Sequence, residues 1–488
     1  MTETRKLIEV ALPLDAINKE AAREKSIRAG HPSTLHLWWA RRPLAACRAV
    51  LFASLVDDPS SHPDRFPTDA DQDAERDRLF DLIKRLVLWE NSSDRDILEA
   101  AWFEIERSCG SDVPTVIDPF AGGGSIPLEA QRLGLSVDAS DLNPVALLIN
   151  KALVELPPKF SGRKPIHPDL QVNVHIKSWN GAHGLAADVR AYAGWMNEEA
   201  KARIGKLYPD VAVPGGLDCE RATVITWLWA RTITCPNPAC KSTMPLLNSF
   251  AVSRKSGRET WLRAKPDLAS QSVTFAVETG AGCPAEGTVN RRGATCLVCH
   301  TTIPLAEVRK AAKSGDLGSQ LLCTVAEGQR RRIYLEADEY QRQTAEVDVP
   351  SDIPSTSLPP VALGFRVQGY GITQHSQLFT NRQLYAMTTF ADLVGEARER
   401  VFTDGGDVEY ADAIATYLTL GIGRLANRCS SQSFWNPGRD TVEQVFARNA
   451  LPMIWVYAEA NPFSTSSGNF LGQIDYMVDA LERLPARG

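Results

Sequence analysis

One stretch of the chain, VPTVIDPFAGGGSIPLEAQRLGLSVDASDLNPVALLIN (residues 113–150), constrains the fold more than any other. A short apolar strand is expected at its start, ending at Asp118. Three glycines, Gly122 to Gly124, then let the backbone turn sharply and approach a ligand closely. A helix with apolar residues at i, i+4 and i+7 follows, and a second strand leads to Asp141. This order of strand, glycine turn, helix, strand and acid is typical of a nucleotide-binding α/β unit.

The spacing within this stretch narrows the choice of cofactor. Asp141 follows Asp118 by 23 positions, about where an open α/β sheet places the carboxylate that accepts from ribose hydroxyls. The glycines lack GxGxxG spacing, so a dinucleotide is not expected. The sequence DPFAGGGSIPLEA resembles the S-adenosylmethionine (SAM) motif of amino-methyltransferases that act on nucleic-acid bases. The resemblance implies a SAM site formed by Asp118, Pro119, Phe120, Ala121, Gly122, Gly123, Gly124, Asp141 and Asn143. The alternative is a structural glycine turn in another α/β enzyme.

Two cysteine pairs predict a metal site. Cys235 and Cys240 form a Cys-x4-Cys pair, and Cys296 and Cys299 form a Cys-x2-Cys pair. Zinc prefers four thiolates in a tetrahedron, and each pair could supply two of them from one tight turn. Such a structural zinc would hold together a small β-module that cannot build its own core. Free buried cysteines are the alternative, and Cys283 and His300 are possible substitute ligands.

Changes in the residue pattern along the chain predict how it is divided into regions. Short β-like runs, such as residues 223–234, 260–263 and 272–277, separate two helical ends. The expected divisions are a helical region at 1–110, a SAM-binding α/β core at 111–215, a zinc-ribbon insertion at 216–346, a proline-rich linker at 347–362 and a helical region at 363–488. The expected fold class is therefore α/β, a Rossmann-like methyltransferase fold with a partial sheet, interrupted by a zinc ribbon.

Composition indicates which compartment the chain occupies and how it could bind nucleic acid. The formal net charge is −6, so nucleic-acid binding would need local basic faces. Residues 1–50, with nine Lys or Arg against five Asp or Glu, and the run Arg330 to Arg332 are candidates, although both could be ordinary solvated surfaces. Ten cysteines are too sparse for a disulfide scaffold, which favours a reducing compartment. With no secretion signal and no long apolar run, we expect a cytoplasmic location.

No catalytic residue is predicted. Enzymes that methylate exocyclic base nitrogens hold a flipped base with an Asp/Asn/Ser-Pro-Pro-aromatic segment beside the SAM site. The two Pro-Pro pairs, in 156–159 and 358–361, have unsuitable neighbours. Asn461-Pro462-Phe463 is one proline short and is more simply a capped turn. A SAM-binding sheet also has about seven strands, and only the opening ones are evident here.

Several long stretches of the sequence carry a specific resemblance to one family. The N-terminal IEVALPLDAINKEAAREKSIRAGHPSTLHLWWARRPLAACRAVLFASLV resembles the opening of the DUF1156 family of zinc-ribbon-containing adenine-specific DNA methylases. The resemblance continues through DPFAGGGSIPLEA, TCPNPACKSTMPL and FTNRQLYAMTT to ALPMIWVYAEANPFSTSSGNFLG. Family members continue into a DPPY-type catalytic segment that this chain lacks. The resemblance also implies a setting in phage-defence or restriction-type gene clusters.

The resemblance suggests roles for residues ahead of the glycine motif. In methyltransferases of this type, such a segment closes over the methionine part of SAM. His31 and Thr34, with His36, could supply hydrogen bonds there, and Arg41 and Arg42 could contact a carboxylate or a DNA phosphate. Trp38 and Trp39 could pack against the adenosyl group or in the core.

These observations predict the SAM-binding half of a DNA adenine N6-methyltransferase, completed by a second chain with the DPPY segment or by self-association, or else a truncated product of a longer gene. Methyl transfer would be direct and in line, with positioning supplying most of the catalysis. One alternative is an RNA base methyltransferase, because the same motifs serve RNA enzymes. Another is a non-catalytic, zinc-containing subunit that binds nucleic acid or a partner.

Overall fold

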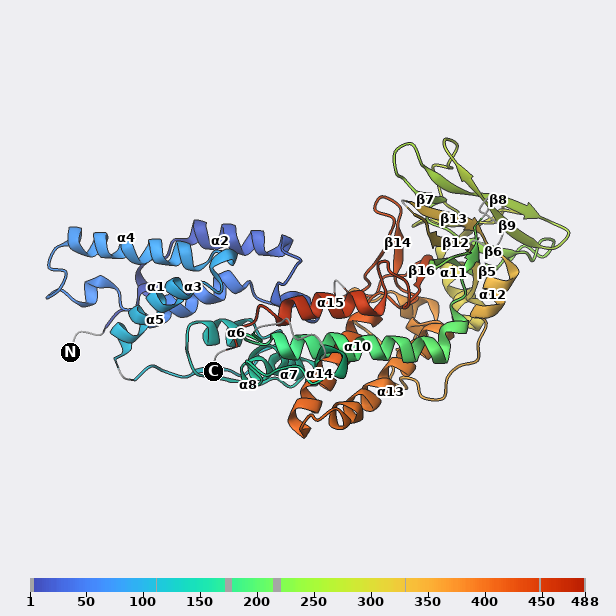
Figure 1. The fold of residues 1–488 in the computed structure, drawn as a ribbon. Coiled ribbons are helices and arrows are strands. Elements are labelled where there is room, and N and C mark those ends of the chain that lie inside the picture. Colours follow the sequence, from blue (N-terminus) through green and yellow to red (C-terminus); the bar gives the residue numbers. More distant parts are fainter. Residues whose placement is uncertain are drawn as a thin grey trace. The chain divides into compact units, whose positions relative to one another are not determined.

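The chain is a mixed α/β protein with helical ends and a curled antiparallel sheet, and it forms two compact units (Figure 1). The computed structural model describes residues 4–110, 112–171, 178–213, 221–329, 331–446 and 449–486. Unit 1 comprises Met1–Tyr192, Arg398–Leu420 and Asp475–Gly488, and unit 2 comprises Ala193–Ala397 and Gly421–Ile474. Four long helices contribute residues to both units: α10 (His183–Ile204), α13 (Asn381–Thr403), α14 (Val408–Ala426) and α15 (Phe470–Leu481).

Unit 2 is organised around one long strand, β5 (Val224–Thr234). Along one edge, β5 pairs antiparallel with β12 (Gly318–Glu327), which pairs in turn with β13 (Arg332–Glu336). On its other side β5 pairs first with β16 (Val456–Ala460) and then with β6 (Thr243–Leu246). Every residue of β5 except Thr234 is buried, so the sheet has a core on each face. This explains why apolar residues occur at neighbouring positions of the strand instead of alternating with polar ones, although Thr226, Arg231 and Thr232 are buried within it as well.

Smaller elements complete unit 2 on both faces of this sheet. The predicted β-like runs are confirmed as β5, β8 and β9. The C-terminal region, expected to be helical, also supplies short strands, one of which lies in the central sheet. The remaining elements are β3 (Val211–Ala212), β4 (Arg221–Ala222), β7 (Ala251–Ser253), β8 (Thr260–Asp267), β9 (Ser272–Thr279), β10 (Gly293–Thr295), β11 (Thr302–Pro304), α11 (Leu305–Ala311), α12 (Glu339–Ala345), β14 (Phe434–Asn436) and β15 (Thr441–Glu443).

Unit 1 is mainly helical, with a small parallel sheet. A single apolar core joins the N-terminal helices to α6, the helix that follows the glycine turn. The two strands, β1 (Val116–Asp118) and β2 (Val137–Ala139), pair in parallel on either side of α6 in the sequence. Its helices are α1 (Leu7–Val10), α2 (Leu14–Arg23), α3 (Leu44–Leu55), α4 (Asp69–Leu86), α5 (Arg95–Cys109), α6 (Ser125–Arg132), α7 (Pro144–Asn150), α8 (Leu156–Lys159) and α9 (Pro168–Gln171).

The β1–β2 sheet is unusual because part of it faces solvent. Parallel sheets are normally covered on both faces. Here Ile117, in the middle of β1, is 73% exposed. Phe120 and Leu142, just beyond the ends of the two strands, are 82% and 98% exposed. Among the residues that the structure describes, β1 and β2 pair only with each other. Further strands or another covering surface would therefore bury these exposed apolar residues.

Across the described ranges, each helix is too short or too polar to span a lipid bilayer.

A buried triad of charges ties α3 to α6. Arg48 Nε donates to Glu129 Oε2 at 2.5 Å, and Arg132 Nε donates to Glu129 Oε1 at 3.1 Å. The two guanidinium groups also donate to the carbonyls of Leu86 and Ser92. All three charged side chains are buried, and burial lowers the pKa of Arg132. Both arginines thus depend on one carboxylate for compensation.

Removing that carboxylate should loosen unit 1. We expect Glu129→Gln to destabilise it by about 3–5 kcal/mol, because two buried arginines lose their only described carboxylate partner. Hydrogen exchange at the amides of α3 and α6 measures the local stability of unit 1 separately from that of unit 2. The control is Asp81→Asn, which breaks the exposed pair with Lys84 and should cost at most about 0.5 kcal/mol. Parental exchange rates in Glu129→Gln would contradict the prediction.

Candidate functional site

The predicted SAM-binding residues come together at the carboxyl ends of β1 and β2. Asp118 ends β1, and its Oδ1 accepts from the Phe120 amide at 3.2 Å. The Ala121 amide donates to the Ser140 carbonyl at 3.0 Å, which joins the turn after β1 to the turn after β2. Gly122 and Gly124 have φ of 51° and 75°, a left-handed conformation that favours glycine. Gly124 is the N-cap of α6, the helix that the sequence pattern predicts after the glycines.

Asp141 bridges the two turns. Its Oδ2 accepts from the Gly122 amide at 2.9 Å, and its Oδ1 accepts from the Asn143 amide at 2.8 Å. These backbone hydrogen bonds, that of Asn143 first, hold the pKa of Asp141 below its usual range. A carboxylate has about four acceptor positions, so each oxygen can still accept from a ligand hydroxyl. Asn143 itself caps α7, its side chain accepting from the Val145 amide at 2.9 Å.

Two side chains from the N-terminal segment pack against the glycines. A Cβ placed on Gly122 would lie 2.7 Å from Trp38 Nε1, and one on Gly123 would lie 3.0 Å from Trp38 Cδ1. Arg41 Nη1 donates to the Gly123 carbonyl at 2.6 Å. Burial lowers the pKa of Arg41 to about 10, so it remains charged at neutral pH. One reason for the glycines is therefore close packing of the chain against itself.

Asn150 is a site residue that the sequence does not reveal. Its Nδ2 donates to the carbonyls of Gly122 and Ala146, and it is buried. Its Oδ1 is buried without a described partner and lies 2.9 Å from the position of a Cβ on Gly124. Asn150 therefore fixes the glycine turn from the side of α7.

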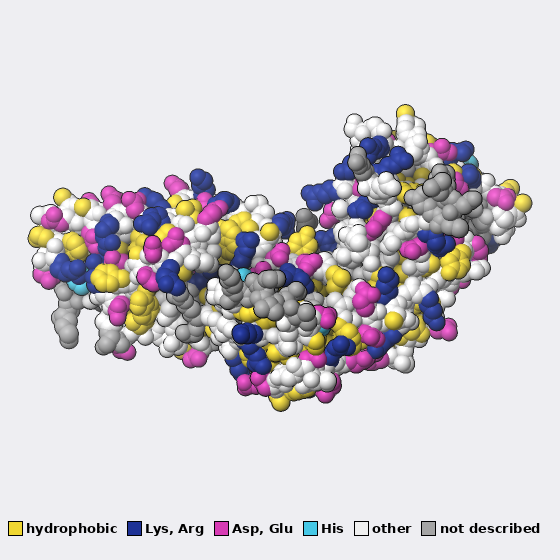
Figure 2. All heavy atoms as spheres, in the orientation of Figure 1, with side chains coloured by type: hydrophobic (Ala, Val, Ile, Leu, Met, Phe, Trp, Pro, Cys, Tyr) yellow, Lys and Arg dark blue, Asp and Glu magenta, His cyan; other side chains and the backbone are white. Residues whose placement is uncertain are grey.

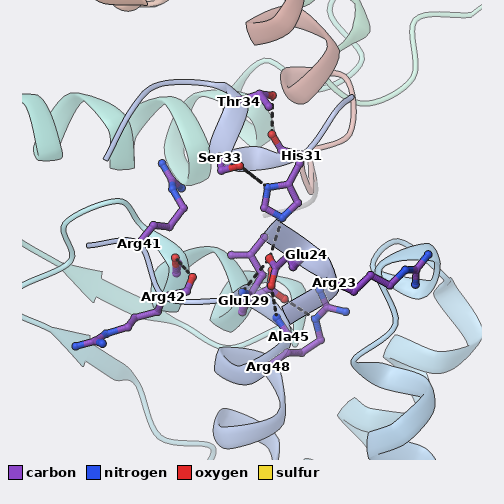
Figure 3. Close-up of polar contacts among 12 residues, drawn as sticks. Arg23, Glu24, His31, Ser33, Thr34, Arg41, Arg42, Ala45, Arg48 and Glu129 are labelled. Carbon is purple, nitrogen blue, oxygen red and sulfur yellow. Dashed lines mark hydrogen bonds and ion pairs between the residues drawn. The ribbon is translucent and has the colours of Figure 1, made fainter. Parts of the chain in front are cut away.

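His31 and Thr34 hold the N-terminal segment together (Figure 3). His31 Nδ1 accepts from the Ser33 amide at 3.1 Å, so the proton is on Nε2, which donates to Glu24 at 2.8 Å. Glu24 also accepts from the Leu44 and Ala45 amides at the start of α3. Thr34 Oγ1 contacts the carbonyls of His31 and Tyr476. The two predicted cofactor contacts are thus made to protein groups here.

Asn461-Pro462-Phe463 is a closed turn in unit 2. Asn461 Nδ2 donates to the Val224 carbonyl at 2.8 Å, and its Oδ1 accepts from the Phe463 amide at 2.9 Å. Asn461 is buried, and the Phe463 ring packs edge-on against Tyr208. With both amide atoms engaged within the fold, this turn serves as the structural cap that the sequence favours.

The four predicted metal ligands lie together in unit 2. The Sγ atoms of Cys235, Cys240, Cys296 and Cys299 all lie within 4.8 Å of one another. The Cys235–Cys299 and Cys240–Cys296 sulfur distances are 3.7 and 3.9 Å. A zinc tetrahedron with Zn–S bonds of about 2.3 Å has S–S edges of about 3.8 Å. The cluster could therefore bind a metal ion such as zinc.

Strand ends and tight turns bring these cysteines together. Cys235 directly follows β5 and Cys296 directly follows β10. Lys241 and His300, which come just after the second cysteine of each pair, have φ of 53° and 60° and turn the chain back. His300 and Cys283 are exposed and lie outside the cluster. Hydrogen bonds with Thr301 lower the pKa of Cys299 to about 6, whereas burial raises the pKa of Cys235 to about 12.

Comparison with known proteins gives one match. Residues 11–82 match DUF1156, a family described as a protein of unknown function. The predicted family resemblance is thereby confirmed for the segment that includes α2, α3 and most of α4. No curated protein and no solved structure matches the chain.

The metal prediction can be tested directly. We expect about one zinc per chain in protein purified without chelator, and a large loss of bound zinc in Cys240→Ser or Cys296→Ser, because each removes one thiolate. Elemental analysis by mass spectrometry measures this. Loss of the metal should also lower the unfolding temperature of unit 2, since the cysteines belong to one of its core clusters.

The matched control is Cys283→Ser, which changes an exposed cysteine outside the cluster and should leave the zinc content unchanged. Parental protein with well under one zinc per chain would contradict the prediction. Equal zinc in the parent and in both cluster variants would do so as well.

Proposed function

We propose that the chain is the SAM-binding half of a DNA adenine N6-methyltransferase, with a Rossmann-like core completed by a second polypeptide. The observation that carries this proposal is the arrangement of Asp118, the glycine turn and Asp141 at adjacent ends of two parallel strands. Ligands of open α/β sheets bind at the carboxyl ends of the strands. The turn also opens α6, whose first amides are suited to a polar or negatively charged group.

The residues present fit SAM in three respects. Asp141 keeps acceptor positions for the two ribose hydroxyls while the backbone holds its carboxylate in place. Leu142 follows it and is exposed, as a side chain that packs against an adenine ring must be before binding. Phe120, on the turn after β1, offers a second exposed apolar surface. SAM would supply a methyl group activated on a sulfonium.

The exposed apolar residues of the β1–β2 sheet support the proposal of a partner chain. Ile117 in β1 is solvent-exposed, and parallel sheets are normally covered by other elements on both faces. The sequence also lacks an Asp/Asn-Pro-Pro-aromatic segment. A second polypeptide that brings this segment and further strands would meet both needs at once. Self-association is the alternative way to cover these residues.

The assignment of SAM predicts the behaviour of Asp141→Ala. We expect SAM affinity to fall about 100-fold or more, because two charge-assisted hydrogen bonds are lost, each worth about 1.5–3 kcal/mol. Isothermal titration calorimetry measures this. Asp138→Ala, an exposed acid within β2, is the control and should keep parental affinity.

A second variant separates binding from folding, because Asp141 also holds the Gly122 amide. Leu142 is 98% exposed, so Leu142→Ala should leave the unfolding temperature unchanged. It should nevertheless weaken SAM binding roughly fivefold, equivalent to about 1 kcal/mol of lost apolar contact. Parental SAM affinity in both variants, or no SAM binding by the parent, would overturn the assignment. The latter would favour a non-catalytic zinc-containing subunit.

The split between two polypeptides predicts low activity alone. We expect the isolated chain to bind SAM but to transfer few methyl groups to DNA, since misplacing the acceptor nitrogen by about 1 Å can cost about a hundredfold in rate. Tritiated SAM with mixed-sequence duplex DNA measures transfer, first with this chain and then with the product of the downstream gene added. Robust incorporation by the isolated chain would contradict the prediction. Preferred methylation of structured RNA in competition with duplex DNA would favour an RNA base methyltransferase.

A further inference from the structure

A wide groove in unit 2 lies apart from the cysteine cluster. It has a volume of about 1030 Å³ and is open to solvent. Three turns contribute to its walls: the turn between β7 and β8, the turn between β12 and β13, and the turn between β14 and β15. Figure 2 shows dark blue Lys and Arg side chains gathered over the region where Figure 1 places β7 and β14.

The groove is strongly positive although the whole chain is negative. Its described lining includes five basic side chains and one carboxylate. The basic residues are Lys255, Arg258, Arg331, Arg332 and Arg439. The carboxylate, Asp440, accepts from Ser253 Oγ at 2.9 Å within the fold. Because the chain carries a formal net charge of −6, this concentration of cations is a local feature.

Three of these cations are available to a ligand. Lys255, Arg258 and Arg331 are exposed, and within the described part of the chain none of them forms an ion pair. The other two are partly engaged: Arg332 donates to Ser466 Oγ at 2.6 Å, and Arg439 lies 3.6 Å from Glu443. A basic group without a carboxylate partner is free to neutralise a phosphate.

Two of the three turns that carry these cations, those after β7 and after β14, are fixed to each other. The Arg254 amide donates to the Pro437 carbonyl at 2.8 Å, and Trp435 Nε1 donates to the Val252 carbonyl at 2.7 Å. These bonds join the β14–β15 hairpin to β7. The Arg258 amide closes its own turn by donating to the Lys255 carbonyl at 2.8 Å. Lys255, Arg258 and Arg439 are therefore presented from a hydrogen-bonded framework.

The lining favours a duplex over a single strand. Proteins that bind single strands stack bases on exposed aromatic rings. Among the described residues of the groove, Tyr334 is the one aromatic side chain, and its half-buried ring packs edge-on against Trp435. Cations without stacking rings suit the phosphates of a backbone whose bases stay paired.

We propose that this groove binds the phosphate backbone of duplex DNA. The choice of DNA over RNA rests on the proposed function, whereas the charge, the framework and the lack of stacking rings stand without it. The groove would add sequence-independent affinity and hold the duplex, and it requires no bound SAM.

The test uses the full chain and a fluorescein-labelled, mixed-sequence DNA duplex. Fluorescence anisotropy is measured over a series of salt concentrations for the parent and for the triple variant Lys255→Ala, Arg258→Ala, Arg331→Ala. We expect at least tenfold weaker binding, and a salt dependence whose slope is smaller by about 2–3 because three phosphate contacts are lost. The control triple variant, Arg291→Ala, Lys310→Ala, Lys313→Ala, removes the same charge from exposed positions of unit 2 outside the groove and should bind as the parent does.

Zinc content and the unfolding temperature establish that each variant is folded. Equal loss of affinity in the two triple variants would overturn the proposal, as would parental DNA affinity in the groove variant. Tighter binding of a matched RNA duplex than of DNA would overturn the choice of DNA. SAM titration of the same proteins distinguishes the two proposals. A groove variant that keeps SAM binding shows that its loss of DNA affinity comes from the groove. DNA binding by a parent that does not bind SAM would refute the proposed function but not the groove.

Discussion

The buried carboxylate of Glu129 is the interaction on which unit 1 depends. It compensates two buried guanidinium groups, Arg48 from α3 and Arg132 from its own helix. Those arginines also donate to the carbonyl of Leu86, which ends α4, and to that of Ser92 beyond it, so one acid joins several segments. A buried ion pair adds little net stability compared with apolar packing, but its partners tolerate few alternative positions. The triad therefore sets where α6, and with it the glycine turn, meets the N-terminal helices.

The N-terminal segment and the glycine turn are one structural assembly. Residues 11–82, which match DUF1156, include Trp38 and Arg41, and these two side chains contact the glycines directly. His31 and Glu24 brace the same segment by fixing the start of α3. The family segment thus supplies one wall of the candidate cofactor site. This gives a physical reason for its position ahead of the glycine turn in the chain.

Unit 2 owes its organisation to β5, which is buried on both faces and ends at the first cysteine of the cluster. A metal at that point would tie the end of the central strand to the β10–β11 hairpin. The basic groove is lined by other residues of the unit, and hydrogen bonds join β7 to the β14–β15 hairpin beside it. Of the three turns that form the groove, the one between β12 and β13 belongs to the sheet of β5, whereas the other two belong to smaller sheets.

Local patterns in the sequence determined much of this protein: the glycine turn between two strands, the cap at Asn143, the apolar run of β5 and the four cysteines are all set by neighbouring residues or by ligand chemistry. A sequence reader could also have noticed Arg48, the one charged residue of α3, and Glu129, which shares α6 with Arg132. That they meet was decided only by tertiary packing, because their contact spans 81 positions. The same holds for β16 beside β5 and for the basic groove, whose cations come from three distant turns. Pairing and packing between segments far apart in the chain leave no periodic trace in either one.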